Sequence, residues 1–295
     1  MPVPPGAPML QTALLEWAPS GWRDLPWRRT RDPWAVLVSE LMLQQTQVGR
    51  VVPKWEAFMA RWPTAAACAS APQSEVVRAW SGLGYNRRAI NLHRCAVAVT
   101  ARPDGAVPAE LGALMALPGV GPYTARAVLA FAFGRDVGVL DTNTARVITR
   151  AAVGQPVARA ALQRVADELV PGGRGWEWNQ AVLDLGATVC LGARPRCAAC
   201  PLADACAWRR AAGPDPAARA RAQRAFTGSD RQARGRLVEA LRRGPITDAA
   251  QACGCPDDAE RVARIVEGVV ADGFATARGG VLVLRERYGE EATFN

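Results

Sequence analysis

Apolar side chains recur at helical spacing along most of the chain. From Trp34 to Leu41, apolar residues fall at positions i, i+3, i+4 and i+7, which predicts a helix with one buried face. Asp32 can cap this helix, with Pro33 in its first turn. Similar patterns predict further helices at residues 51–61, 73–80, 91–101, 109–116, 160–170 and 176–189. Because strand-like alternation is missing from residues 1–210, we expect this part of the chain to be all-α.

The pattern changes toward the end of the chain. Residues 211–226 carry several arginines together with Gly213, Pro214 and Pro216 and have no apolar periodicity, which indicates a linker. Residues 232–242, 247–253 and 257–272 then predict three short helices, and residues 273–276 and 281–284 predict a hairpin. We therefore expect residues 227–295 to form a small α+β domain of winged-helix type.

A glycine-containing segment, residues 117–125, separates two predicted helices, and Pro122 suits the first turn of the second one. Free backbone N–H groups at such a turn suit a phosphate, so Gly119, Val120 and Gly121 are candidate contacts to a nucleic acid backbone. Asp141 follows one helix later, at an expected N-cap position. On spacing alone, an ordinary helical hairpin with a capping aspartate explains this pattern equally well.

Polar residues of unusual kind cluster around the first predicted helix. Glu40 lies beside its apolar stripe and would be partly desolvated, although a lone helix glutamate is usually solvated. Gln44, Gln45 and Gln47 follow near the helix end, where they suit hydrogen bonds to base edges or sugars. Tyr85, between glycines and arginines, is compatible both with a wedge into a base stack and with an ordinary surface aromatic.

Composition favours a polyanionic partner. The 295 residues carry a formal net charge of +9, almost entirely from arginine, since Lys54 is the only lysine. A Schiff-base mechanism would therefore depend on Lys54 or the N-terminal amine.

We see no secretion signal and no apolar run that could span a membrane, so we expect a soluble, cytoplasmic protein. His93, the only histidine, has no histidine partner and is expected to be an ordinary helix residue.

Four cysteines lie close together near the end of the all-α part. In an intracellular protein, cysteines are more often ligands or inert thiols than disulfides. Only one pair here has the close spacing of a zinc ribbon, whereas a short loop with four cysteines can hold all corners of a [4Fe–4S] cluster. We favour the cluster over zinc and over unliganded thiols for this loop, which contains Cys190, Cys197, Cys200 and Cys206. Cys253 and Cys255 have no further cysteines nearby and are expected to be core or surface thiols.

Together, these features resemble the helix-hairpin-helix (HhH-GPD) DNA glycosylases, most closely the adenine DNA glycosylases of the MutY type. The resemblance covers about residues 20–210. It is carried by Leu25-Pro26-Trp27-Arg28, by residues 39–48 (SELMLQQTQV), by Gly82-Leu83-Gly84-Tyr85, by residues 117–125, by Leu140-Asp141-Thr142-Asn143 and by the four-cysteine loop.

The resemblance implies a two-lobed fold with an active site in the cleft between the lobes. A six-helix barrel with the hairpin would occupy residues 30–135, and an iron–sulfur cluster domain would be formed by residues 1–29 and 136–210. It further implies that Glu40 is the general acid and Asp141 its electrostatic partner. The remaining roles implied are active-site support for Tyr123 and Asn143, insertion into the base stack for Gln45 and Tyr85, and lining of an adenine pocket for Arg28 and Leu43.

The residue chemistry agrees with these roles. Adenine leaves only after a ring nitrogen is protonated, and an apolar surrounding should raise the pKa of Glu40 so that it keeps its proton near neutral pH. Asp141 at a helix N-terminus should stay ionised and stabilise the developing oxocarbenium ion. Tyr123 occupies the position where bifunctional relatives carry a Schiff-base lysine, so we expect a monofunctional enzyme.

The expected substrate is double-stranded DNA with adenine opposite 8-oxoguanine or guanine, bound by a monomer associated with the nucleoid. One departure matters, because the family's Phe-Ser-His triplet for 8-oxoguanine is absent. A thymine or uracil glycosylase acting opposite guanine is the alternative within the superfamily, and a non-catalytic iron–sulfur DNA-binding protein is the alternative outside it. An all-α protein with a merely stabilising metal loop would leave the glutamines and the basic charge unexplained.

Overall fold

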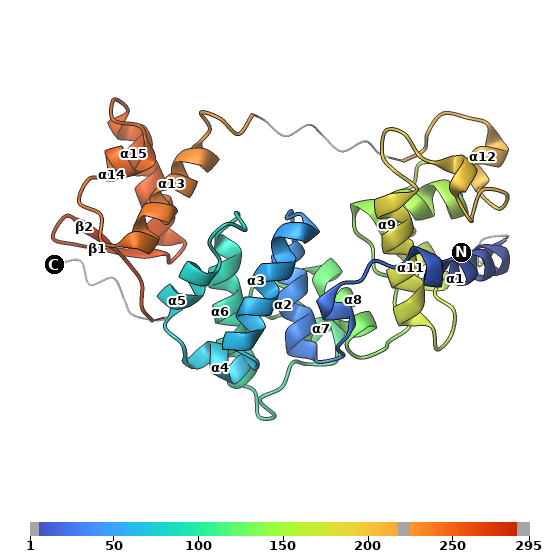
Figure 1. Ribbon diagram of the computed structural model, residues 1–295, viewed down its shortest axis with the longest axis horizontal. Coiled ribbons are helices and arrows are strands. Elements are labelled where there is room, and N and C mark those ends of the chain that lie inside the picture. Colours follow the sequence, from blue (N-terminus) through green and yellow to red (C-terminus); the bar gives the residue numbers. More distant parts are fainter. Residues whose placement is uncertain (1–5, 218–224, 288–295) are drawn as a thin grey trace. The chain divides into compact units, whose positions relative to one another are not determined.

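A computed structural model describes residues 6–217 and 225–287 of the chain. In this part the chain is helical, apart from one small antiparallel hairpin (Figure 1). No helix in the described ranges has the length and apolar character needed to cross a membrane. The chain divides into two compact units, one formed by Met1–Val36, Ala109–Met115 and Val120–Arg221, the other by Leu37–Pro108, Ala116–Gly119 and Ala222–Asn295.

The first unit is built around a long N-terminal helix. Its helices are α1 (Ala7–Gly21), α7 (Leu111–Met115), α8 (Pro122–Phe131), α9 (Thr142–Ile148), α10 (Arg159–Glu168), α11 (Gly175–Thr188) and α12 (Ala207–Ala211). Helix α1 packs against α11, and its buried Leu10 and Leu14 share one core with Trp178 and Leu185. A short π-helical turn (Thr149–Val153) continues α9. The sequence patterns predicted the other main helices with shifted ends, but not α1.

The first part of the second unit is a small helical bundle. Helix α2 (Pro33–Leu43) leads into it and is followed by α3 (Val48–Arg61), α4 (Ala65–Ser70), α5 (Gln73–Ala79) and α6 (Arg87–Thr100). Helix α6 packs against α4 and α5 (Figure 1), and the fully or almost fully buried side chains include Phe58, Trp80 and Ile90. The predicted Asp32 cap is confirmed, because its carboxylate accepts from the Trp34 and Ala35 N–H groups at 3.2 and 3.0 Å.

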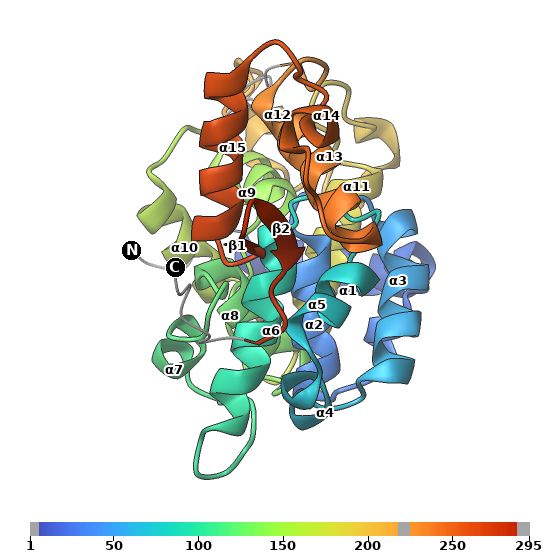
Figure 2. The ribbon, with the colours of Figure 1, turned by 90° about the vertical axis from the view of Figure 1, so that its left-hand side faces the viewer.

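The C-terminal part of the second unit contains the three predicted helices and the predicted hairpin. These elements are α13 (Asp230–Arg243), α14 (Ala249–Cys253), α15 (Ala259–Ala271), β1 (Ala275–Arg278) and β2 (Val281–Leu284). Strand β1 pairs with β2 from Ala275↔Leu284 to Arg278↔Val281, and α15 lies beside this hairpin (Figure 2). A separate bridge joins Ile246 to Leu282. Of the predicted linker, residues 218–224 lie outside the described residues.

Candidate active site

Asp141 is the N-cap of α9, as predicted, and its side chain is held from two sides. Its Oδ1 accepts from the Thr144 N–H at 2.6 Å, while its own N–H donates to the Thr144 hydroxyl at 2.7 Å. The Asn143 amide donates to the other carboxylate oxygen, Oδ2, at 3.4 Å. This reciprocal capping fixes the carboxylate at the positive end of the helix, where a negative charge is favoured.

A guanidinium connects this capped carboxylate to the cysteine loop. Arg146 donates to the Asn143 side-chain oxygen at 2.9 Å and to the Cys190 carbonyl oxygen at 2.7 Å. It also donates to the Gly186 carbonyl oxygen at 2.7 Å. Arg146 was not among the site residues predicted from the sequence. Its position three residues after Asn143 places both on one helix face, which is the only signal for it in the sequence.

Glu40 is a buried carboxyl group on α2. It is only 4 % exposed, and its neighbours Leu37 and Leu41 on the same helix are completely buried. A solvated helix glutamate is therefore ruled out at this position. Leu43 ends the helix and is partly buried, and Gln44 beyond it is also partly buried. Glu40 belongs to the second unit, and Asp141 belongs to the first.

Arg28 is held in place by a carboxylate that was not predicted from the sequence. Asp184 on α11 is completely buried and accepts from both terminal nitrogens of Arg28, at 2.7 and 2.8 Å. The same carboxylate accepts from the Arg23 Nε at 2.5 Å. A bidentate arginine–carboxylate pair fixes the plane of the guanidinium as well as its position. Because the partners lie more than 150 residues apart in the chain, no local pattern could have indicated this contact.

The two residues predicted to enter a base stack share an uncommon backbone conformation. Gln45 has a φ of 54° and Tyr85 a φ of 42°, and both side chains are exposed. Among the described non-glycine residues, Ala212 is the only other one with positive φ. Such a conformation costs about 1–3 kcal/mol and persists only where neighbouring structure enforces it.

Arg88 supplies that enforcement for both segments. Its side chain reaches six acceptors, which are the carbonyl oxygens of Leu41 (2.9 Å), Met42 (2.8 Å), Leu83 (3.2 Å), Gly84 (3.0 Å) and Tyr85 (3.3 Å) and the hydroxyl of Thr46 (2.9 Å). Arg88 is 7 % exposed, and burial lowers its pKa to about 10. One buried guanidinium thus connects the end of α2 to residues 82–85, the Tyr85 segment. The sequence did not reveal this contact.

Only one of the two hairpin glycines is required by the backbone. Gly119 has a φ of 80°, and a Cβ atom there would lie 2.7 Å from the Cβ of Asn91. Gly121 is the extended N-cap of α8, and a Cβ at this position would meet open space. Val120 between them is buried, and Tyr123 in the first turn of α8 is partly buried. Helices α7 and α8 pack against each other, as expected for the predicted hairpin.

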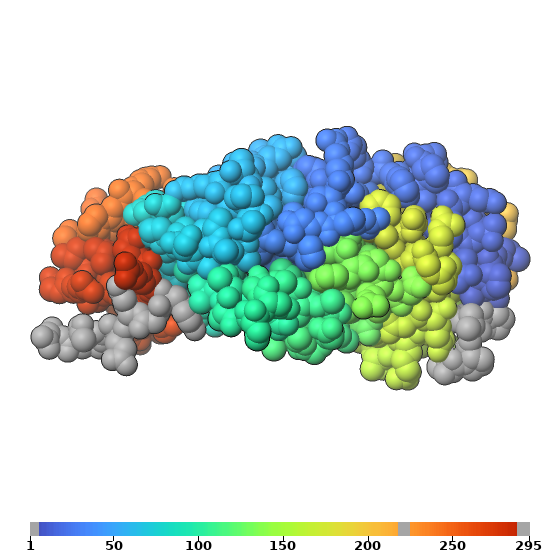
Figure 3. All heavy atoms as spheres, turned by 90° about the horizontal axis from the view of Figure 1, so that it is seen from below, coloured from blue at the N-terminus to red at the C-terminus, as the bar shows by residue number. Residues whose placement is uncertain are grey.

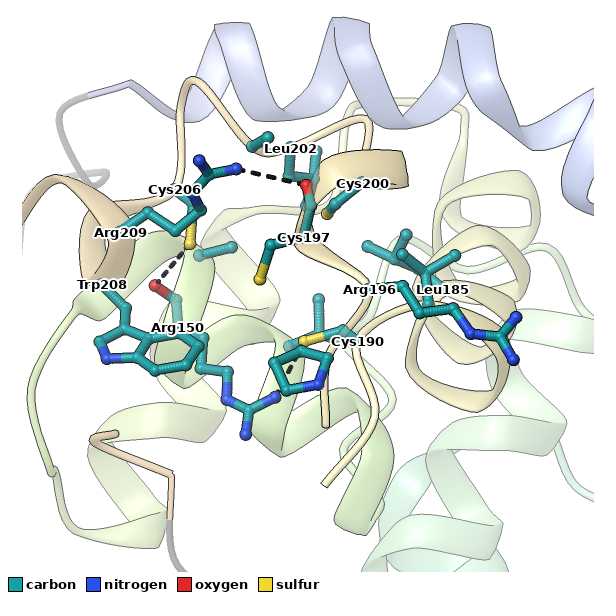
Figure 4. A pocket seen from close by; sticks show the side chains of 15 residues that line it. Arg150, Leu185, Cys190, Arg196, Cys197, Cys200, Leu202, Cys206, Trp208 and Arg209 are labelled. Carbon is teal, nitrogen blue, oxygen red and sulfur yellow. Dashed lines mark hydrogen bonds between the residues drawn. The ribbon is translucent and has the colours of Figure 1, made fainter. Parts of the chain in front are cut away.

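The four cysteines of the loop line one cavity in the first unit (Figure 4). Cys190 follows α11, Cys197 begins a single 3₁₀ turn that Cys200 caps, and Cys206 precedes α12. All four are free thiols, and burial raises the pKa of Cys200 to about 11. Within the described residues, no three histidine, cysteine or acidic side chains come close enough together to hold a single metal ion.

Arg150 forms part of the wall of this cysteine cavity. Its side chain is only 2 % exposed, and it donates to the Cys190 Sγ at 3.4 Å and to the Leu191 carbonyl oxygen at 2.7 Å. Asp215 neutralises its charge from the other side at 2.5 Å. Hydrogen bonds to ligand sulfurs are a known way to tune a metal–thiolate centre.

His93, Cys253 and Cys255 have ordinary surroundings. His93 is 3 % exposed, and its Nε2 lies 3.0 Å from the Ala71 carbonyl oxygen. Burial lowers its pKa. Cys253 is completely buried and Cys255 partly buried, in agreement with the prediction that they are core or surface thiols.

Comparison with known proteins identifies the family. The sequence model for the HhH-GPD superfamily base excision DNA repair proteins matches residues 38–171. The adenine DNA glycosylase of Mycolicibacterium smegmatis is 45 % identical over 267 residues, which cover 88 % of this chain and 90 % of that protein. The chain belongs to the adenine DNA glycosylase family. The Mycobacterium tuberculosis adenine DNA glycosylase is 44 % identical over 278 residues, 90 % of either chain.

Thymine-directed glycosylases share the core of this family's fold. A solved structure of a thermostable thymine-DNA glycosylase superimposes with a TM-score of 0.65 at 31 % identity, covering 70 % of this chain and 97 % of that one. The thymine/uracil-DNA glycosylase of Methanothermobacter thermautotrophicus is 34 % identical over 191 residues, 63 % of this chain and 86 % of that protein. The matches to adenine glycosylases of the two mycobacterial species are therefore both higher in identity and longer.

Proposed function

We propose that this protein hydrolyses the N-glycosidic bond of adenine mispaired with 8-oxoguanine or guanine in double-stranded DNA. The observation that supports this function best is a pair of carboxyl groups in opposite environments. Glu40 is almost completely buried on an apolar helix face, whereas Asp141 is capped, partly exposed and held at a helix N-terminus. Opposed environments are how one site provides both a proton donor and a fixed negative charge.

In the proposed mechanism, Glu40 donates its proton to a ring nitrogen of the extruded adenine. The bond from C1′ to the base nitrogen then breaks, and its electron pair leaves with the neutral adenine. Asp141 stabilises the positive charge that develops on the sugar, with Asn143 and Thr144 fixing its two oxygens. A water molecule attacks C1′ and gives up a proton, which completes hydrolysis.

Under the same proposal, we expect no strong strand cleavage through a Schiff base. Tyr123 lies in the first turn of α8. The family resemblance implies that bifunctional relatives carry a lysine at this position. A phenol cannot form an imine with the opened sugar, and Lys54 is the only lysine in the sequence. We therefore expect the product to be an intact strand with an abasic site.

In this proposal, DNA is bound by the helical hairpin between α7 and α8 and by the two segments that contain Gln45 and Tyr85. Gln45 and Tyr85 would enter the base stack, Gln44 would contact base or sugar edges, and Arg28, oriented by Asp184, would line the adenine pocket with Leu43. The backbone from Gly119 to Gly121 would meet a phosphate.

The arrangement of residues 30–135 as a barrel beside a cluster domain belongs to the same proposal. The bridge from Ile246 to Leu282 supports a winged-helix C-terminal domain, because it adds a third strand position to the hairpin.

The cysteine cavity fits a [4Fe–4S] cluster better than zinc. A zinc ribbon usually takes its four ligands from two close pairs of cysteines, whereas only Cys197 and Cys200 form a close pair here. A cubane cluster is larger and takes one thiolate at each of four corners, so its ligands stand further apart around a cavity. When bound, the cluster would join Cys190, Cys197, Cys200 and Cys206 into one rigid loop.

The decisive experiment is base release from matched duplexes that contain A opposite 8-oxoguanine, A opposite G, and T or U opposite G. We expect adenine release from the first two and none from the last pair. Release of thymine or uracil alone would favour the thymine-directed function, which the structural likeness to a thymine-DNA glycosylase makes the second candidate. No release from any duplex would indicate a non-catalytic DNA-binding protein.

Conservative substitutions test the two carboxyl roles. We expect Glu40→Gln and Asp141→Asn each to lower single-turnover adenine release by at least about 100-fold, because general-acid and electrostatic contributions are of that size. Affinity for the same duplex, measured by fluorescence anisotropy, should change little. Turnover close to wild type in either variant would contradict the role assigned to that residue.

A further inference from the structure

The C-terminal part of the second unit contacts α5 and the residues around it through polar groups. The Gln73 side chain, which is completely buried, donates to the Gly273 carbonyl oxygen at 2.8 Å. The Gln73 N–H donates to the Glu286 carbonyl oxygen at 2.9 Å, and the Ser74 hydroxyl donates to the Glu286 carboxylate at 2.6 Å. In Figure 3, orange and red atoms of the C-terminal residues lie directly against cyan and teal atoms of the same unit.

The end of α13 makes a second set of contacts, on both sides of the Tyr85 segment. Arg242 donates to the Val77 carbonyl oxygen at 2.9 Å and to the Asn86 side-chain oxygen at 2.8 Å. Glu239 accepts from Arg242 at 2.7 Å and from the Ser81 hydroxyl at 3.2 Å. Since Ser81 and Asn86 immediately flank residues 82–85, one ion pair on α13 holds both ends of this four-residue segment.

This ion pair is well suited to holding a strained backbone. The Arg242 side chain is only 7 % exposed, so its hydrogen bonds are shielded from competing water. Tyr85 itself keeps a left-handed backbone conformation and remains 43 % exposed. A side chain that has to enter a base stack gains from being fixed in advance, because the ordering cost is then met on folding rather than on binding.

The surface of α15 argues against DNA reading by this domain's own helix. In a winged-helix protein that reads DNA, the last helix before the hairpin enters the major groove. Here the exposed charged side chains on and just before α15 are mostly acidic, namely Asp257, Asp258, Glu260 and Glu267, with Arg264 as the exposed basic one. Arg261 is already paired with Asp230 at 2.7 Å. Such a face repels phosphates.

We propose that the C-terminal domain positions Tyr85 for insertion into the base stack, with Arg242 and Glu239 as the positioning residues. The proposal rests on the insertion role assigned to Tyr85 under the proposed function. It gives the domain a task in base extrusion that needs no contact between α15 and DNA. The domain acts through Ser81 and Asn86, which flank residues 82–85, whichever base stands opposite the adenine.

The first test compares Arg242→Met with Arg243→Met in the full-length protein. The two substitutions remove the same charge from adjacent positions, but the Arg243 side chain is 78 % exposed and lies 3.8 Å from Glu239. Unstacking is followed with 2-aminopurine placed next to the mispaired adenine. We expect Arg242→Met to reduce the unstacking signal and the rate of adenine release about tenfold, since charged hydrogen bonds are lost, while Arg243→Met stays close to wild type. Equal behaviour of the two variants would overturn the proposal.

A double-mutant cycle shows whether Arg242 acts through Tyr85. If it does, adding Arg242→Met to Tyr85→Ala lowers unstacking no further than Tyr85→Ala alone, so the two effects are strongly non-additive. Independent, additive losses would mean that Arg242 supports the fold in general, and the proposal would fail. Release of adenine by the wild-type protein tests the proposed function separately, and unstacking can be measured without any base release.

Two milder substitutions keep the proposal testable if Arg242→Met unfolds. Asn86→Ala and Ser81→Ala each remove one contact from the partly exposed side of the segment, leaving the buried arginine in place. Both should weaken unstacking while leaving the melting temperature and the affinity for undamaged duplex unchanged. If both variants unstack DNA as the wild type does, the contacts from Arg242 and Glu239 do not position Tyr85, and the proposal fails.

Discussion

Buried arginines act as connectors between distant segments of this protein. Arg28 joins an N-terminal turn to α11, Arg88 joins the end of α2 to the Tyr85 segment, and Arg150 joins α9's continuation to the cysteine loop. The planar guanidinium presents five donors in a fixed geometry, which a lysine ammonium cannot reproduce. The contacts at these positions therefore need arginine specifically, in a sequence that contains a single lysine.

Arg88→Lys should show how much depends on this geometry. We expect a loss of about 2 kcal/mol in the free energy of unfolding, because several buried carbonyl oxygens lose their donors while the charge stays. Urea unfolding measures the change, and the rate of adenine release should fall with it. The matched control is Arg87→Lys, whose side chain is 67 % exposed. An equal loss in both variants would contradict the connector role.

His93 makes stability depend on pH in one direction. Burial holds its folded-state pKa below the ordinary value of 6.5, and its Nδ1 has no hydrogen-bond partner within the described structure. The unfolded chain therefore binds the proton more readily, so the stabilising effect is complete above pH 6.5 and is lost as the pH falls. We expect His93→Gln to flatten the fall in unfolding free energy between about pH 7.5 and about pH 5.5. An unchanged slope in that variant would assign the effect to other groups.

At the scale of elements, the two hairpin glycines form an internal comparison. Gly119→Ala should lower the free energy of unfolding by about 1–3 kcal/mol, because it forces a side chain into a left-handed conformation against Asn91. Gly121→Ala has open space and ordinary backbone angles, so its effect should stay within about 0.5 kcal/mol. Chemical unfolding of both variants decides, and similar values would show that the Gly119 backbone relaxes.

The sequence predicted elements well and contacts poorly. Helices α2, α6 and α11 follow from apolar spacing, and Asp32 and Asp141 mark helix starts, because these signals are local. Helix α1 escaped prediction although Leu10, Leu14 and Ala18 lie on one buried stripe, since prolines at both ends obscure it. Helix α4 is too short for a period to be visible. Arg88, Asp184 and Arg242 depend on partners tens to hundreds of residues away, which no window along the chain contains.

At the scale of the whole molecule, the cysteine loop predicts a coloured protein. We expect anaerobically purified protein to be brown, with broad visible absorbance and about four iron atoms per chain. Cys200→Ser should lose this iron, whereas Cys255→Ser, outside the loop, should retain it. A colourless preparation with one zinc ion per chain would contradict the cluster.

The left-handed turns at Gln45 and Tyr85 share a single anchor in Arg88, and this restricts how the protein can search DNA. Under the proposed roles, the two probes keep a constant separation and have to test a duplex together. A DNA duplex that opens at only one base step would not admit both side chains, and the protein would leave that position. Discrimination then begins with the mechanical weakness of a mispair, before any atom of adenine reaches Glu40.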